Sequence, residues 1–302
     1  MKYSLSFFII CIWSFIITAQ DLEPRFLSSV PLGTNFSGAI YGYSKGNILL
    51  NSLEIEDLNA KLNTVGVFYG RSFKLFNKSA KFDAVVPYAF GKLNALVNKV
   101  DSTVTKSGFM DPTLRVSMIL IGDKPLRLND FGNREIKKFK LGTAFKVKFP
   151  FGKYESAKTI NLGANRWGFQ LKVAGAYFVT KKLILELHVD SWFFTENNSY
   201  IEVNSLKQEP LLSTQLHVAY IFNPKIWASV SVGQVAFGET RINGVPSQNN
   251  QKNSKYGATF SYKVGKHSNL KVAVTDGLFT YAQADFTTFL VGYTVLWFDK
   301  MK

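Results

Sequence analysis

Two histidines and two acidic residues are spaced so that they could share one site. Glu186, His188 and Asp190 are two residues apart, which places them on one face of an extended strand. A second alternating segment carries Gln215 and His217 with the same spacing. If these segments pair as a hairpin, His188 lies beside Gln215 and His217. Imidazoles and carboxylates at ligand distance can bind a transition metal or move protons.

The same residues also fit a polar network that fills the interior of a narrow barrel, and we favour this interpretation. We therefore predict no bound metal and no cofactor. Ser213 shares the phase of His217 and Glu186, which leaves open a hydrolase built from these three residues. The sequence has no nucleophile elbow, phosphate loop or zinc-ligand spacing, so we predict that the protein is not an enzyme.

Basic residues occupy the same phase on neighbouring segments. A turn at Thr180 and Lys181 would place Lys172 opposite Asp190 and Arg166 opposite Glu196, so that opposite charges meet across the wall. We expect the solute pathway to be lined by these groups together with other lysines. The basic interior positions predicted are Lys146, Lys148, Arg166, Lys172, Lys255 and Lys263.

The composition narrows the class of partner. The 36 Lys and Arg residues outnumber the 21 Asp and Glu residues, which gives a net charge of +15. These basic residues are dispersed, and no helix-turn-helix, zinc-finger or aromatic RNA-binding pattern accompanies them, so we exclude nucleic acid as a partner. A positive lumen would instead concentrate small anions.

Large apolar residues alternate with small or charged ones along most of the chain. In the stretch from Leu141 to Phe149, for example, Lys146 and Lys148 fall on the phase opposite to the apolar residues. Membrane barrel strands alternate in this way because one face meets lipid and the other meets the lumen. We predict twelve strands, near residues 35–43, 62–73, 80–92, 109–122, 138–150, 165–179, 182–195, 210–223, 225–238, 255–264, 268–280 and 284–298.

The lengths of the links support an antiparallel transmembrane β-barrel. Short turns alternate with long polar links, which are expected at 44–61, 93–108, 151–164, 196–209 and 239–254. Two links depart from this rule, since 123–137 is long for a turn and 281–283 is short for a loop. A soluble β-sandwich is the alternative, but strands longer than about 6 residues and an aromatic content of 15% favour the membrane barrel.

The first 19 residues resemble a cleaved signal peptide. Lys2 precedes an apolar stretch from Leu5 to Ile17, and Ala19 ends a small-residue cleavage site. We therefore predict a signal peptide at 1–19 and one barrel domain at 20–302, located in the bacterial outer membrane. The single cysteine, Cys11, lies in the signal peptide, so the mature chain would contain no thiol.

The last predicted strand has an alternating aromatic and β-branched face from Phe289 to Trp297. It resembles the terminal strand that barrel-assembly machinery recognises, so this machinery and outer-membrane lipid are expected partners. The chain departs from the usual pattern by continuing beyond the aromatic residue through 298–302.

Three segments resemble a known family. Residues 109–115 contain Asp111 and Pro112 in a G-D-P-x-L-R-like run, with Met110 in place of the glycine. Residues 148–154 are similar to V-x-x-P-x-G-x-Y, and residues 160–167 are similar to I-N-L-G-x-N-R-W. The last segment carries Asn161, Gly163, Asn165 and Trp167.

These motifs are similar to those of the outer-membrane transporter family named for the MetA pathway of phenol degradation, over roughly residues 30–298. The resemblance implies a barrel that transports solutes and links it weakly to aromatic compounds. We therefore predict a passive channel for small solutes, anionic or aromatic in character. A structural or adhesive barrel that transports nothing is the alternative.

Overall fold

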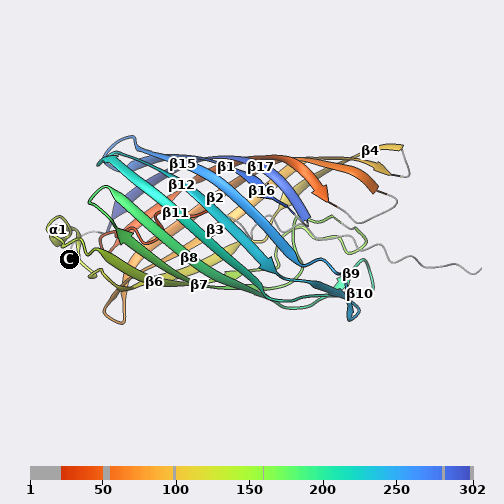
Figure 1. The fold of residues 1–302 in the computed structure, drawn as a ribbon, viewed down its shortest axis with the longest axis horizontal. Helices are drawn as coiled ribbons and strands as arrows, with labels where there is room; N and C mark the ends of the chain where they lie inside the picture. Colours follow the sequence, from red (N-terminus) through yellow and green to blue (C-terminus); the bar gives the residue numbers. More distant parts are fainter. Residues whose placement is uncertain (1–21, 50–54, 98–99, 159, 281–282, 300–302) are drawn as a thin grey trace, which may run out of the picture.

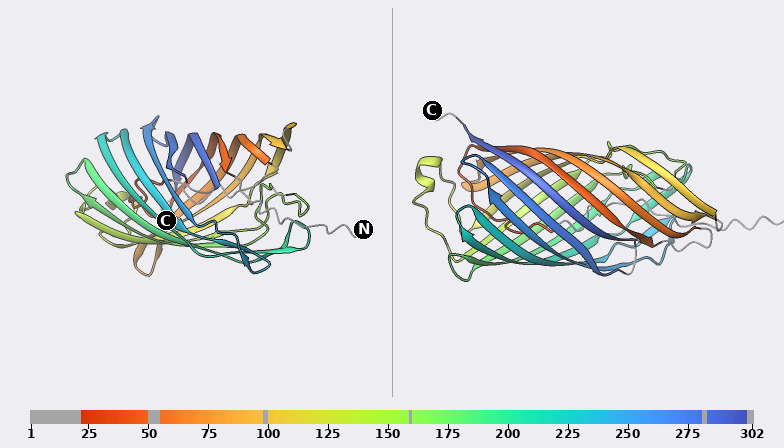
Figure 2. Two further views of the ribbon diagram at one scale, coloured as in Figure 1. Left: turned by 45° about the vertical axis from the view of Figure 1, so that its right-hand side comes forward. Right: turned by 90° about the horizontal axis from the view of Figure 1, so that it is seen from above.

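The computed structural model describes residues 22–49, 55–97, 100–158, 160–280 and 283–299, and nearly all of them form one antiparallel barrel (Figure 1). The strands are inclined to the long axis of the molecule and surround a central space (Figure 2). The wall strands are β1 Thr34–Leu49, β2 Ile55–Leu75, β3 Lys78–Val97, β4 Val100–Phe109, β5 Thr113–Ile121, β6 Phe139–Lys148, β7 Gly168–Phe178, β8 Leu183–Phe194, β11 Leu211–Asn223, β12 Ile226–Phe237, β15 Gln251–Lys263, β16 Ser268–Phe279 and β17 Gln283–Phe298.

The barrel closes because β1 pairs with both β2 and β17. Both β4 and β5 pair with β3, one after the other along its length, so together they form one wall strand. The break between them falls at Met110, Asp111 and Pro112, where proline has no N–H to donate to the ladder. The predicted count of twelve wall strands is therefore confirmed.

Two predicted loops are largely strand, and the prediction for them is wrong. Most of 44–61 belongs to β1 and β2, and most of 93–108 belongs to β3 and β4, while 50–54 and 98–99 lie outside the described residues. These extensions keep the backbone ladder, as in the pairing of Gly46 with Ala60. Their outer faces carry fewer large apolar residues, so the alternation that marks the rest of the wall fades there.

The two ends of the barrel differ (Figure 1). The link 123–137 contains the short helix α1 Leu128–Phe131 at the end where the chain turns tightly. At the other end the links 196–209 and 239–254 contribute a separate small sheet. Its strands are β9 Asn197–Tyr200, β10 Asn204–Gln208, β13 Thr240–Ile242 and β14 Val245–Pro246.

Large apolar side chains point outward and polar side chains point inward. On β17 the side chains of Phe289, Tyr293 and Trp297 are each between 44% and 47% exposed. Fully buried positions include His188 and His217, both 0% exposed. This is the reverse of a soluble protein core. No helix in the described parts of the chain is long and apolar enough to cross a membrane.

Residues 22–33 run inside the barrel before β1 begins, and we call them the N-terminal segment. Phe26 and Leu27 are 8% and 3% exposed and pack against small residues of the wall. At Gly142 of β6, a Cβ atom would lie 2.4 Å from Leu27 Cδ2, so the segment approaches the wall where a side chain is missing. The sequence analysis did not predict this segment.

Candidate solute pathway in the barrel lumen

The carboxylate of Glu23 lies among three basic side chains of the wall. Glu23 Oε1 is 2.8 Å from Arg115 Nη1, and Glu23 Oε2 is 2.7 Å from Lys172 Nζ. Lys146 Nζ is 3.8 Å from Glu23 Oε1. The three bases come from β5, β7 and β6, which are neighbours in the sheet. The N-terminal segment thus brings one negative charge to a part of the wall that carries three positive charges.

Burial, the largest influence on Glu23, would raise the pKa of its carboxyl. The positive charges of Arg115, Lys172 and Lys146 together outweigh burial and hold the pKa well below its ordinary value of 4.5. Glu23 therefore stays ionised, and its charge is held in place by the wall.

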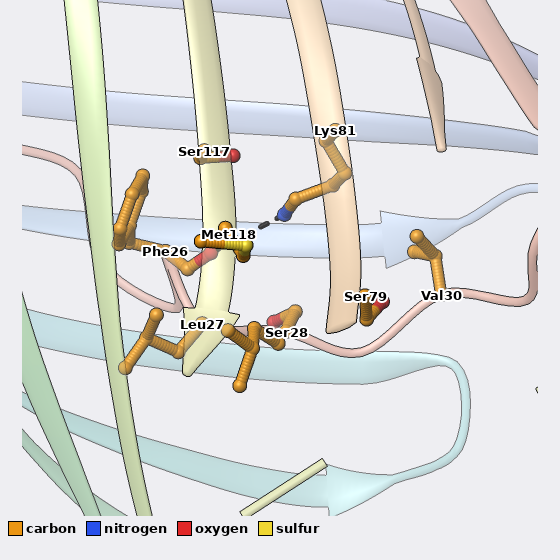
Figure 3. Close-up of a pocket in the computed structure, with 9 residues that line it drawn as sticks. Phe26, Leu27, Ser28, Val30, Ser79, Lys81, Ser117 and Met118 are labelled. Atoms are coloured by element: carbon orange, nitrogen blue, oxygen red, sulfur yellow. Dashed lines mark hydrogen bonds between the residues drawn. The ribbon is translucent and has the colours of Figure 1, made fainter. Parts of the chain in front are cut away.

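The ring of Phe26 lies beside the same bases. Arg115 Cζ is 5.6 Å from the centre of the Phe26 ring, and Lys172 Nζ is 5.3 Å from it. Lys81 Nζ donates a hydrogen bond of 3.3 Å to the Phe26 carbonyl, drawn in Figure 3. The cavity left between the segment, β3 and β5 has a volume of about 10 Å³, which is room for about one water. The segment is tightly packed here.

The predicted histidine cluster forms, and its members bond to one another directly. His217 Nε2 lies 3.3 Å from His188 Nδ1, and His217 Nδ1 lies 2.7 Å from Ser231 Oγ. His188 Nε2 is 3.5 Å from Glu186 Oε2. The same Glu186 oxygen accepts a hydrogen bond of 2.6 Å from the backbone N–H of Arg25. A chain of polar groups therefore connects β12 to the N-terminal segment.

The structure places the side chains that the two chemistries left open by the sequence would use. Among the described residues, no group of three or more His, Cys, Asp or Glu side chains is arranged to hold a metal ion. The hydrolase arrangement is wrong, because the serine bonded to His217 is Ser231 and not Ser213. Ser213 is four residues from His217 on the same strand, about 13 Å at roughly 3.3 Å per residue. The sequence analysis missed Ser231. This serine lies directly opposite His217 in the β11–β12 ladder, so the register of the two strands was the signal that could have identified it.

Two predicted charge pairs meet different partners. Lys172 and Asp190 are opposite each other in the β7–β8 ladder, as predicted, but Lys172 pairs with Glu23. Asp190 Oδ1 accepts a hydrogen bond of 2.7 Å from Gln170. Arg166 lies beyond the end of the ladder and donates to Gln208 rather than pairing with Glu196.

Aromatic rings and bases line the lumen next to Glu23. Lys146 Nζ and Lys148 Nζ lie 5.9 Å and 5.4 Å from the centre of the Trp192 ring. Trp192 stacks on Phe194 at 6.0 Å, and Arg166 Cζ lies 4.5 Å from the Phe194 ring centre. Of the other predicted lysines, Lys255 is partly buried on the interior phase and Lys263 is exposed at the end of β15. Gln215 accepts a hydrogen bond of 3.3 Å from the Glu23 backbone N–H.

The motif residue Asp111 lies at the break between β4 and β5 and binds the link 151–164 through hydrogen bonds. It is 6% exposed, and its two carboxylate oxygens accept hydrogen bonds of 2.9 Å from the backbone N–H groups of Gly152 and Ala164. Gly152 and Gly163 are so close that a Cβ on Gly163 would lie 2.6 Å from the Gly152 backbone. Two glycines are therefore required at this contact.

The other motif residues shape the same link. Asn161 Nδ2 donates to the carbonyls of Glu155 and Lys158, which closes a turn. Asn165 has a φ of 52° and donates a hydrogen bond of 2.9 Å to Asn197 Oδ1. Trp167 is 38% exposed on the outer surface and stacks on Phe169 with ring centres 6.4 Å apart. These contacts build the wall and one end of the barrel rather than the lumen surface.

A family model described as "Putative MetA-pathway of phenol degradation" matches residues 52–293. The chain belongs to this family. None of the curated proteins is similar enough in sequence to give a match.

Several solved structures share the fold of this MetA-pathway family member. The COG4313 outer membrane channel from Pseudomonas putida F1 has 17% identity and a TM-score of 0.75, with 92% of this chain and 100% of that chain covered. The beta domain of the Bordetella autotransporter BrkA has 10% identity and a TM-score of 0.52, with 88% and 100% covered. The translocator domain of the autotransporter NalP from Neisseria meningitidis has 11% identity and a TM-score of 0.52, with 89% and 90% covered. The fold is thus that of outer-membrane barrels.

Proposed function

We propose that this protein is an outer-membrane channel through which small solutes pass passively, and that its lumen favours anionic or aromatic solutes. The observation that carries the proposal is the lumen wall itself, where Arg115, Lys146 and Lys172 converge on one point. Aligned bases of this kind raise the local concentration of anions. The ring of Phe194, which is partly buried and stacks on the buried Trp192, offers a surface for planar solutes.

The outward-facing residues support a location in the outer membrane. Apolar and aromatic side chains cover the exterior, as the hydrocarbon of a bilayer requires of a barrel. Export would use the predicted signal peptide at 1–19, which lies outside the described residues. Insertion would depend on the barrel-assembly machinery, for which the outward face of β17 is the proposed recognition element.

Phe26 and Leu27 of the N-terminal segment pack inside the barrel against the neighbouring wall strands from β5 to β11. We infer that the segment must move for a solute to pass along this part of the wall. The segment is attached to the wall through polar contacts of Glu23 and Arg25, and contacts of this kind can be exchanged for contacts with water or solute. The same filling supports the second candidate, a barrel that serves envelope structure or adhesion and transports nothing.

Conductance separates the two candidates. The mature protein would be reconstituted into planar bilayers and into liposomes for swelling assays. A channel gives discrete current steps, and liposomes swell faster in small anionic solutes than in neutral solutes of equal size. If the folded barrel carries no current and speeds the entry of no solute, the structural role replaces the channel.

A further inference from the structure

The N-terminal segment presents a carboxylate and a phenyl ring to the same two wall residues. Arg115 and Lys172 each contact the Glu23 carboxylate, at 2.8 Å and 2.7 Å. The same two cationic groups lie 5.6 Å and 5.3 Å from the Phe26 ring centre, which is the distance of a cation–π contact. Glu23 and Phe26 are three residues apart, and their functional groups meet at one place.

A small molecule can present a carboxylate and a phenyl ring side by side, just as this peptide segment does. An aromatic carboxylate carries both groups at short distance within one rigid body. It could place its charge among the bases and its ring against their cationic groups, with less loss of conformational entropy than two flexible side chains.

The wall around these groups has the charge to hold such an anion. Arg115 Nε is also 2.9 Å from Asp83 Oδ2, so its single positive charge is shared between Glu23 and an acid of the wall. Lys172 is 2% exposed, and its ion-pair partner is Glu23. If the segment leaves, Lys172 loses its closest countercharge, and the carboxylate of an incoming anion can replace it.

We propose that Arg115, Lys146 and Lys172 form a binding site for aromatic carboxylates, and that Glu23 and Phe26 occupy this site as an internal substitute for the solute. The solute and the N-terminal segment then compete for one site. Binding of the solute displaces the segment and opens the lumen, and removal of the solute lets the segment return. This inference rests on the proposed channel function for its biological meaning, but the binding site can be tested without transport.

The test measures benzoate binding to the purified mature protein by isothermal titration calorimetry, with protein-free micelles as the blank. Benzamide keeps the ring without the charge, and acetate keeps the charge without the ring. The variants Glu23→Gln and Phe26→Ala weaken the internal competitor. The matched controls are Glu135→Gln, whose carboxylate is exposed and pairs with Lys137, and Phe76→Ala in an exposed turn.

We expect the double variant Glu23→Gln with Phe26→Ala to bind benzoate at least about tenfold more tightly than the unchanged chain, while the double control does not. Benzoate should bind more tightly than acetate, and benzamide should give no saturable heat. Adding Lys172→Met to the double variant should remove the gain. Equal binding of benzoate and benzamide, or no gain in the double variant, overturns the proposal.

A second measurement leaves the site residues intact, in case the variants fold poorly. Ser28 belongs to the N-terminal segment, and the mature chain is predicted to have no cysteine, so Ser28→Cys provides a unique thiol. Saturating benzoate should speed its reaction with a water-soluble thiol reagent, and benzamide should not. An unchanged rate overturns the proposal.

The two tests also separate this inference from the proposed function. A protein that conducts but shows no preference for benzoate keeps the channel and loses this site. A protein that binds benzoate as described but carries no current keeps the site and loses the channel.

Discussion

Glu23→Gln tests how firmly the N-terminal segment is held in the lumen. The substitution keeps the size of the side chain and one acceptor oxygen but removes the charge. In the native chain that charge makes two short contacts, 2.8 Å to Arg115 and 2.7 Å to Lys172, and a longer one of 3.8 Å to Lys146. The side chain of Glu23 is 24% exposed, so solvent weakens these contacts only in part.

The magnitude follows from the two short contacts. A hydrogen bond to a charged group contributes about 1.5–3 kcal/mol, and glutamine retains part of each. The nearly buried Lys172 would then have lost its countercharge, which adds to the cost of the closed state. We expect the closed state to lose about 2–4 kcal/mol relative to the open state. That is roughly a 30-fold to 1000-fold change in the ratio of the closed population to the open population.

The assay is the fraction of time that single channels spend open in planar bilayers. A native channel that is mostly closed should become mostly open in Glu23→Gln, and Glu135→Gln should behave like the native chain. If Glu23→Gln remains closed as often as the native protein, the ion pairs of Glu23 do not hold the segment, and the reasoning from the contacts of Glu23 fails.

Three further predictions concern pH, folding and metal. Because the closed state lowers the Glu23 pKa below 4.5, the stabilisation by this carboxylate is complete above pH 4.5 and is lost as the pH falls through the lowered value. The open fraction should therefore rise on acidification below pH 4.5, and a Glu23→Gln channel that shows the same rise would exclude this cause. Asp111→Ala leaves two backbone N–H groups without their acceptor and should reduce barrel stability by about 2–4 kcal/mol, measured by urea unfolding in micelles. Loss of less than about 0.5 kcal/mol would refute that role for Asp111. His188→Ala should leave the metal content of the purified protein unchanged in elemental analysis, and a fall would restore the metal-site hypothesis.

The sequence predicted the wall where the membrane imposes a pattern. Along β7 and β8 one face is apolar and the other polar, and the tight turn at Thr180 fixes how the two strands pair. The placement of Lys172 opposite Asp190 and of His188 beside Gln215 followed from that register. Side chains that alternate in this way reveal both the strand and its inner face.

The contents of the lumen could not be predicted in the same way. The N-terminal segment has irregular backbone, so its contacts leave no period in the sequence. Glu23 meets Lys172 across 149 positions of the chain, and no local rule connects the two. The register alone assigned Lys172 to Asp190, whereas the closer charge came from a segment that lies outside the ladder. A charged and aromatic run after the signal peptide, from Glu23 to Phe26, was the available signal.

The motif residues could be found from the sequence, but their contacts could not. Asp111, Asn161 and Asn165 were recognised by type and spacing, but only the structure shows that they fasten one link to the wall. The extended hairpins at 44–61 and 93–108 were missed because strands that project past the apolar belt need no apolar outer face. Backbone pairing and a buried apolar cluster that includes Leu58, Ala60 and Leu93 maintain them, whereas their outer faces carry no regular apolar pattern.

The reversal potential of the mature protein in a planar bilayer under a salt gradient shows whether the lumen conducts anions in preference to cations. A lumen whose wall bases meet at Glu23 should carry a current selective for anions, and the selectivity should increase in Glu23→Gln. A correctly folded barrel that carries no current, or one that selects cations in both forms, would show that the wall bases do not form a pathway for anions.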